Sequence, residues 1–126
     1  MSCINISIYT FDFRIGEEID SFPLEVNLFS GNASYGLYHQ RDWTRFSTWD
    51  NDHDHSDNEN CAIENGGGWW FSNCRDSCLT ADLNNLRWQS DKNEFLSLKS
   101  ADMYIRPKSF RRNGRLCEKF SEYCYN

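Results

Sequence analysis

Three aspartates lie at alternate positions of one short segment of the chain, FSTWDNDHDHSDNENC. They are Asp50, Asp52 and Asp54, and His53 and His55 are interleaved with them. Aspartates two positions apart in an extended loop can direct their carboxylates to one side, where backbone carbonyls complete the hard oxygen ligands that calcium prefers. A solvated acidic loop has the same composition. On these residues alone, calcium binding and a solvated loop are equal alternatives.

Two other kinds of metal site can be tested against the same segment. An EF-hand loop that starts at Asp50 would have His55 in place of its glycine and Cys61 in place of its glutamate, so this pattern fails. The register that starts at Asp52 fails at the same two positions. Zinc would use two close pairs of ligands, and the chain offers only a loose imitation of them: His53, His55, Cys61, Cys74 and Cys78. Zinc is therefore a minor alternative.

Catalytic chemistry is not expected from these residues. No histidine accompanies a nucleophile motif, and the sequence has no glycine-rich phosphate-binding loop. The clustered carboxylates are explained by cation binding. We therefore expect that the protein is not an enzyme.

The composition indicates an extracellular protein. Six cysteines in 126 residues favour an oxidising compartment with a disulfide framework, and Asn5 and Asn32 begin N-glycosylation triplets of a secreted glycoprotein. A formal net charge of −6 argues against nucleic-acid binding, and no segment has the length of a transmembrane helix. Because the composition is that of a secreted protein and the first residues lack the features of a signal peptide, we expect a fragment, a processed product or an incomplete gene model.

The elements that position the aspartate segment are strands. Residues 4–15 alternate between apolar and polar side chains, and so does FPLEVNLF at residues 22–29. Residues 40–93 show little periodicity, and NEFLSLKSADMYIRP then predicts further strands that end at Pro107. This order is typical of an α+β or mainly β domain with one long irregular segment.

The segment from Phe46 to Cys74 resembles the signature of the fibrinogen C-terminal, or fibrinogen-related, domain. In that family Phe-Ser-Thr-x-Asp-x-Asp-x-Asp opens a calcium loop, and Asn-Cys-Ala, Gly-Trp-Trp and a second cysteine follow. The flanking segments FRIGEE, LEVNLFSGNAS and SLKSADMYIRP resemble the family as well. The resemblance covers residues 9–107. It implies an α+β fold that is the C-terminal part of such a domain, with antiparallel strands and a long irregular calcium-binding loop region.

The domain organisation follows from this resemblance. Residues 1–107 are expected to form a partial fibrinogen C-terminal domain that is truncated at its N-terminal side. Residues 108–126 are expected to form a C-terminal extension that contains Cys117 and Cys124.

The resemblance also implies a calcium site. Asp52 and Asp54 match the ligating side chains, and the backbone carbonyls of Ser56 and Asn58 match the remaining ligands. Asp50 matches a neighbour that is not usually a ligand. The two histidines of the loop are then expected to face solvent.

The same resemblance places a disulfide and a ligand pocket. The resemblance pairs Cys61 with Cys74, which matches the family's second cysteine by its distance from Trp70. Cys78 is the alternative second cysteine, because it matches by its distance to Leu83 and Asn84. Family lectins similar to ficolins and tachylectins hold an acetyl group beside the calcium, and the matching ligand-binding residues are Asn73, Arg75 and Trp88. Arg75 replaces a histidine and favours an acidic ligand, and Trp88 stands in for an aromatic wall that the shortened chain has lost. Trp69 and Trp70 are expected to pack in the core.

The function that the resemblance implies is secreted, non-catalytic recognition. The first expectation is calcium-supported, lectin-like binding of a glycan or acetylated ligand in innate immunity. The alternative is a protein-interaction module of angiopoietin-like, matrix, clotting or receptor–ligand type, because the sugar pocket is degenerate. The expected partners are a glycan or an extracellular protein, with no nucleic acid and no membrane span, and an oligomer is compatible with both functions.

Overall fold

The computed structural model describes residues 7–31, 37, 43–82, 85–89, 94–105, 111–112 and 115–116. The two glycosylation asparagines Asn5 and Asn32, together with Cys117, Cys124 and most of the expected C-terminal extension, lie outside these residues. The described elements are β1 (Ile8–Ile15), the 3-10 helix η1 (Glu18–Asp20), β2 (Leu24–Gly31), α1 (Cys61–Asn65), β3 (Arg87–Gln89), β4 (Phe95–Ser97), β5 (Arg111–Arg112) and β6 (Arg115–Leu116).

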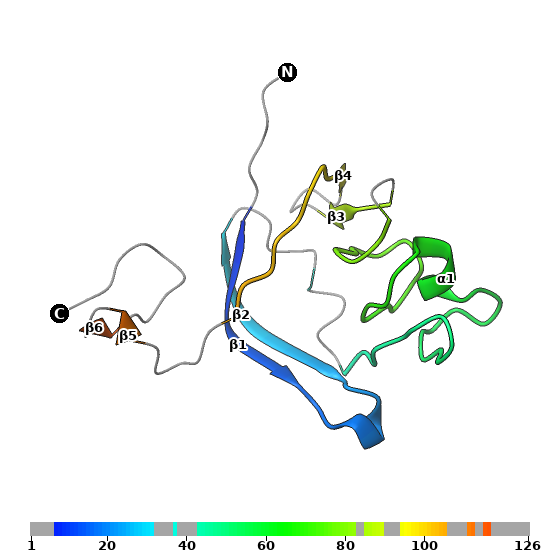
Figure 1. Cartoon of the computed structure of the whole chain (residues 1–126), viewed down its shortest axis with the longest axis horizontal. Coiled ribbons are helices and arrows are strands. Elements are labelled where there is room, and N and C mark those ends of the chain that lie inside the picture. Colours follow the sequence, from blue (N-terminus) through cyan, green and yellow to red (C-terminus); the bar gives the residue numbers. More distant parts are fainter. Residues whose placement is uncertain are drawn as a thin grey trace.

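The hairpin β1–β2 is the longest regular part of the structure (Figure 1). Its strands pair antiparallel, with Phe13 opposite Val26 and Ile15 opposite Leu24, and η1 lies in the connection between them. Leu24 and Val26 are fully buried, and Glu25 between them is only half-buried. The two strands expected from the alternating pattern are therefore confirmed.

The remaining strands are short. β3 pairs antiparallel with β4, where Trp88 lies opposite Leu96, and β5 pairs antiparallel with β6. The expectation that strands continue from β4 to Pro107 is wrong for the described residues 98–105. A strand needs a neighbouring strand for its backbone hydrogen bonds. Between the described residues, the one backbone hydrogen bond from residues 98–105 to another segment runs from the N–H of Leu98 to the Leu86 carbonyl, at 3.0 Å.

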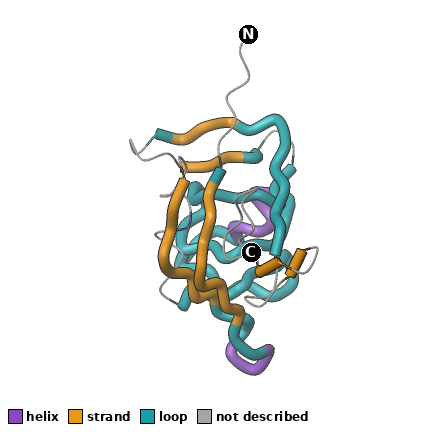
Figure 2. Tube along the Cα trace, turned by 90° about the vertical axis from the view of Figure 1, so that its left-hand side faces the viewer, coloured by secondary structure: helices purple, strands orange, loops and turns teal. Residues whose placement is uncertain are grey.

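A long irregular segment with α1 at its centre packs against one side of the hairpin (Figures 1 and 2). Its aromatic side chains form the core together with Leu24 and Val26 of β2. Trp69 is 1% exposed and Trp70 is 8% exposed, and the Trp70 ring makes edge contacts with Phe13 and Phe46. Both tryptophans are therefore core residues, as expected.

Antiparallel strands, one short helix and a long irregular segment make this an α+β fold. Among the described residues, no helix has the length and apolar character that crossing a membrane requires.

Candidate functional site

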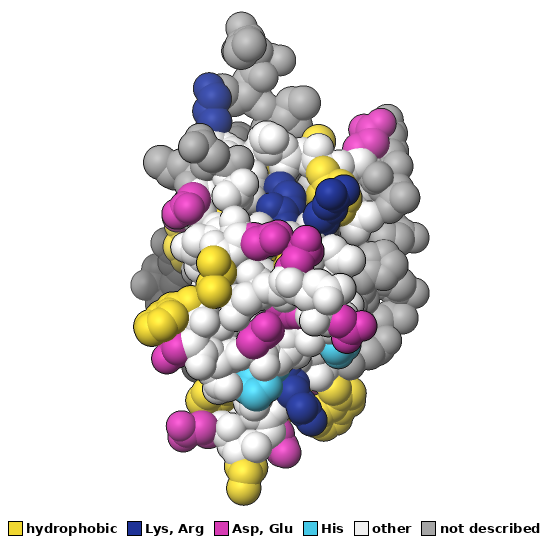
Figure 3. All heavy atoms as spheres, turned by 90° about the vertical axis from the view of Figure 1, so that its right-hand side faces the viewer, with side chains coloured by type: hydrophobic (Ala, Val, Ile, Leu, Met, Phe, Trp, Pro, Cys, Tyr) yellow, Lys and Arg dark blue, Asp and Glu magenta, His cyan; other side chains and the backbone are white. Residues whose placement is uncertain are grey.

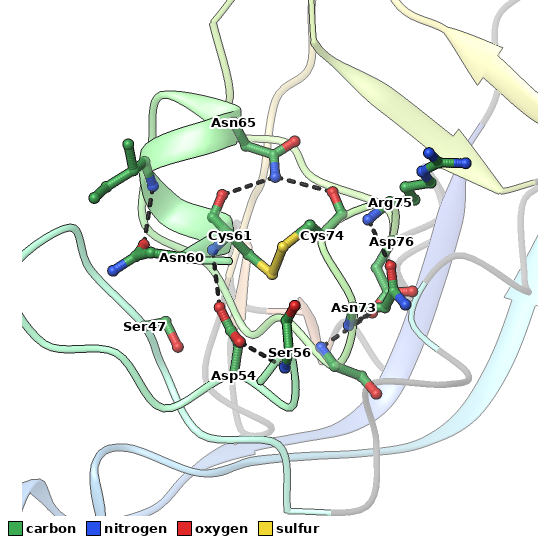
Figure 4. The surroundings of a disulfide bond; sticks show 12 residues. Ser47, Asp54, Ser56, Asn60, Cys61, Asn65, Asn73, Cys74, Arg75 and Asp76 are labelled. Atoms are coloured by element: carbon green, nitrogen blue, oxygen red, sulfur yellow. Dashed lines mark hydrogen bonds between the residues drawn. A yellow bond between two sulfur atoms is a disulfide. The ribbon is translucent and has the colours of Figure 1, made fainter. Parts of the chain in front are cut away.

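Asp54 ties the aspartate loop to the rest of the molecule (Figure 4). Its Oδ2 accepts a hydrogen bond from the backbone N–H of Cys61 at 2.8 Å, at the start of α1. Its Oδ1 accepts another from the backbone N–H of Ser56, also at 2.8 Å. The Asp54 carboxylate is therefore held at a fixed place beneath the disulfide-bonded Cys61.

Asp52 and Asp50 are more exposed than Asp54, and their hydrogen bonds join residues only two positions apart. Asp52 Oδ1 accepts a hydrogen bond from the backbone N–H of Asp54 at 3.1 Å, and Asp50 Oδ1 accepts one from the Thr48 hydroxyl at 2.8 Å. In the described part of the chain, Oδ2 of Asp52 has no hydrogen-bond partner, so this oxygen is available to a ligand. Ser56 is half-buried beside Asp54, and Asn58 is exposed.

The ends of the loop are fixed to each other. Asn60 caps α1, because its Oδ1 accepts a hydrogen bond from the backbone N–H of Ile63 at 3.0 Å. Its Nδ2 donates to the backbone carbonyl of Trp49 at 3.3 Å, on the other side of the loop. Asparagine is a favoured N-cap residue, and here the same side chain also closes the loop at its base.

The two histidines differ in their surroundings. His55 is exposed, as expected. The expectation is wrong for His53, which is half-buried with its Nε2 2.9 Å from the hydroxyl of Ser21, in the β1–β2 connection. The backbone N–H of His53 also donates to the buried Ser47 hydroxyl at 2.9 Å. These contacts attach the loop to the hairpin.

The zinc alternative does not fit the described residues. The described side chains that approach one another closely enough to share a metal form two groups, and both include Cys74. Cys74 is in a disulfide and offers no thiolate, and neither group contains a histidine. The donor chemistry of the loop is instead carboxylate and carbonyl oxygen, which suits calcium.

Cys61 and Cys74 form a disulfide across 13 positions of the sequence, in the pairing that the resemblance implies. Cys78, the other candidate, is a free and buried thiol. A tight turn follows Cys74. The carboxylate of Asp76 accepts hydrogen bonds from the backbone N–H groups of Ser72 and Asn73, at 3.0 and 2.6 Å.

This turn exposes two of the three predicted ligand-binding residues. Asn73 and Arg75 flank Cys74, and both are exposed at the surface. The backbone N–H of Arg75 donates to Asn73 Oδ1 at 3.0 Å, so the two residues are held together. Trp88, the third, is 2% exposed and packs in the core, so it offers no wall to a surface ligand.

Arg87 supports the turn from β3. Its guanidinium donates to the backbone carbonyls of Cys74 and Arg75, the latter at 3.1 Å, and to Asn65 Oδ1 at 2.7 Å. The buried Asn65 amide in turn donates to the carbonyls of Cys61 and Cys74, at 2.8 and 3.0 Å (Figure 4). Helix α1, the disulfide and the Asn73–Arg75 turn therefore form one hydrogen-bonded unit.

Several of these supporting residues were not predicted from the sequence. Asn60 carried a signal, since an asparagine directly before a helix is a typical cap. Asn65 and Arg87 had no such signal, because their contacts with Cys74 and with each other join positions that only the folded chain brings close. Figure 3 shows that acidic side chains are spread over the face on which α1 and the loop lie.

Comparisons with known proteins agree with this structure. The family model described as "Fibrinogen beta and gamma chains, C-terminal globular domain" matches residues 5–108. Human fibrinogen-like protein 1 is 35% identical in a match that covers 79% of this chain and 38% of that protein. Protein scabrous of Drosophila melanogaster is 36% identical over 96 residues, which cover 75% of this chain and 12% of that protein.

Among solved structures, the fibrinogen-like globe domain of human ANGPTL2 is similar to 63% of this chain, with a TM-score of 0.48 and 28% sequence identity. The similar region spans 33% of that structure, and the chain thus spans well under half the length of each relative named here. The match of the family model over most of the sequence shows that this chain belongs to the family of fibrinogen C-terminal globular domains.

Proposed function

We propose that this chain is a non-catalytic, extracellular recognition domain in which a calcium-binding loop supports a protein-binding surface around Asn73 and Arg75. The observation that supports the proposal is the connection between the calcium-binding loop and the surface around Asn73 and Arg75. Asp54 of the loop bonds to the backbone of Cys61, and Cys61 is linked by the disulfide to Cys74, which lies between Asn73 and Arg75. A cation that orders the loop therefore also restricts the ligand surface.

Calcium is the proposed cofactor, and the residues present fit it. Asp52 and Asp54 supply carboxylate oxygens, and the backbone carbonyls of Ser56 and Asn58 are the proposed neutral ligands. Each Asp54 oxygen accepts one hydrogen bond, which leaves lone pairs that a cation can use. When bound, calcium would neutralise carboxylates that lie close together in the chain and repel one another.

The burial of Trp88 favours a protein partner. A pocket for an acetyl group needs apolar walls, and Trp88 lies inside the core. The exposed groups that remain are the amide of Asn73 and the guanidinium of Arg75. Arginine in a fixed position makes paired hydrogen bonds to a carboxylate, so an acidic side chain of a partner protein suits this surface.

Glycan binding is the second candidate. It is favoured by the exposure of two polar side chains directly beside the disulfide, because a carboxylate or acetamido group of a sugar can bond to an amide and a guanidinium as well. The two candidates share the calcium loop and differ in the class of ligand.

Two parallel screens with the purified chain test the proposal. One screen uses immobilised extracellular proteins and the other an array of acetylated and sialylated glycans, each with calcium or with a chelator. We expect calcium-dependent capture of a protein partner that Arg75→Gln and Asp54→Asn abolish. The matched control is Asp57→Asn, because Asp57 is an exposed loop aspartate outside the proposed ligand set.

The outcomes separate the candidates. Calcium-dependent capture on the glycan array alone would replace the protein partner with a sugar. Binding that is unchanged by chelator and by Arg75→Gln would contradict the proposed surface altogether.

A further inference from the structure

A cleft of about 260 Å³ lies between the turn after η1 and the start of the aspartate loop. The first residue of η1, Glu18, and the following turn residues Ser21 and Phe22 form one wall, and Phe46, Thr48 and Asp50 of the loop form the other. The volume lies just below the ~300–1,000 Å³ typical of pockets for small molecules. It is therefore of a size for a single side chain.

Hydrogen bonds and ring packing hold the walls of this cleft in place. The backbone N–H of Phe46 donates to the Ser21 carbonyl at 2.9 Å, which joins the two walls. The Phe46 ring packs edge-on against Trp70 at a centroid distance of 5.0 Å, and Trp70 Nε1 donates to the Phe22 carbonyl at 2.8 Å. A pre-formed cleft binds its ligand at a lower cost in conformational entropy.

The backbone at the edge of the cleft is strained. Ser21 and Phe22 have positive φ angles of 63° and 50°. A bulky residue rarely adopts this conformation, and the surrounding structure must hold it there. The bonds from Trp70 and Phe46 to the carbonyls of these two residues supply that restraint. As a result Phe22 remains 42% exposed at the cleft.

The charge in the cleft is negative and uncompensated. Glu18 and Asp50 are exposed carboxylates, and no lysine or arginine within the described part of the chain pairs with either of them. The Thr48 hydroxyl donates to Asp50 Oδ1 at 2.8 Å and orients that carboxylate. Phe22, Phe46, Ser21 and Asn51 complete the lining, so two aromatic residues lie beside the two carboxylates.

Two carboxylates beside two aromatic rings are complementary to an organic cation. An aromatic face attracts a cation within about 6 Å, and a carboxylate accepts short charge-assisted hydrogen bonds. Arginine fits better than lysine, because its planar guanidinium can stack on a ring and bond to a carboxylate at the same time.

We propose that this cleft binds an arginine side chain of a partner protein. The cleft contains neither the proposed calcium ligands nor Asn73 and Arg75. The inference therefore goes beyond the proposed function and assigns a second, oppositely charged contact to the same domain.

NMR titration of the purified chain with N-acetyl-arginine methylamide tests the proposal. We expect saturable changes in the ring signals of Phe22 and Phe46, whether calcium or a chelator is present. The citrulline derivative has the same shape without the charge and should cause no saturable change. The lysine derivative should bind more weakly than the arginine derivative.

The test variants are Glu18→Gln and Asp50→Asn, and each should weaken arginine binding by about tenfold, since each removes one charge-assisted contact. Asp20→Asn is the matched control, because Asp20 is an exposed carboxylate of η1 outside the cleft. Both test residues are exposed, so the variants should fold, and the dispersion of the NMR spectrum checks this.

Equal binding of the citrulline derivative would overturn the proposal, and so would an equal loss in Asp20→Asn. Competition between calcium and the arginine derivative would also overturn it, because the cleft would then be an inorganic cation site. The probe is a single amino-acid derivative read at two phenylalanines. Its result is therefore separate from partner capture at Asn73 and Arg75, and either can fail alone.

Discussion

Asp54 is the residue through which the loop and the disulfide are connected. From the sequence, Asp52 and Asp54 are equivalent, because both match calcium ligands of the family. In the structure, their surroundings differ. Asp52 is exposed and bonds within the loop, whereas Asp54 is half-buried and bonds to the first residue of α1. Removing Asp54 should therefore affect both the loop and the helix, and removing Asp52 only the loop.

Arg87 is expected to stabilise the fold although it is not itself one of the proposed ligand-binding residues. Arg87→Lys keeps the charge and loses the fork of donors that reaches Cys74, Arg75 and Asn65. We expect the free energy of unfolding to fall by about 1.5–3 kcal/mol, the usual contribution of a hydrogen bond to a charged group. Urea denaturation measures it.

The control for this change is Arg75→Lys. Arg75 is an exposed arginine on the same turn, so its replacement should alter the free energy of unfolding by less than about 0.5 kcal/mol. Equal effects of the two substitutions would show that the Arg87 contacts contribute nothing specific.

At the scale of elements, the five-residue helix α1 is too short to be stable by itself. Three restraints keep it in place: the Asn60 cap at its start, the disulfide through Cys61, and Gly66 at its end with a φ of 72°. A left-handed residue at this position is the common way to end a helix, and glycine adopts it without a steric penalty. These restraints, and not the intrinsic helix propensity of its residues, therefore stabilise α1.

Asn60→Ala should lower the free energy of unfolding by about 1 kcal/mol through loss of the helix cap. Asn60→Asp is the informative comparison, because it keeps the capping oxygen and loses only the bond to the Trp49 carbonyl. We expect Asn60→Asp to retain most of the stability and to loosen the base of the loop. Thermal unfolding and hydrogen exchange of loop amides measure these two effects. Equal losses in both variants would mean that the cap is not what stabilises α1.

At the scale of the whole molecule, the Cys61–Cys74 disulfide is the covalent link between the loop side and the ligand side. The double variant Cys61→Ser/Cys74→Ser should be less stable by about 3 kcal/mol, the entropy effect of a loop of this length. Chemical denaturation of the oxidised protein and the variant gives the difference. A peptide map that joined Cys61 to Cys78 instead would contradict the pairing.

Part of this architecture follows from local patterns in the sequence. The hairpin was predictable because Leu24 and Val26 alternate with polar residues, and that period of two decides which face is buried. The burial of Trp88 and the end of β4 at Ser97 were not, because both depend on which segments pack beside them. The calcium ligands came from motif resemblance, whereas the contacts of Arg87 and His53 join positions far apart in the sequence.

The coupling of the loop to the ligand surface is tested most directly by a calcium titration followed by NMR at the backbone amides of Asn73 and Arg75. Binding should stabilise the fold by about 2.7 kcal/mol at a hundredfold excess of calcium over its dissociation constant. We expect both amide signals to shift with calcium in the wild type and in Asp57→Asn, and not to shift in Asp54→Asn. Calcium binding that leaves these two amides unchanged, or shifts that persist in Asp54→Asn, would contradict this coupling.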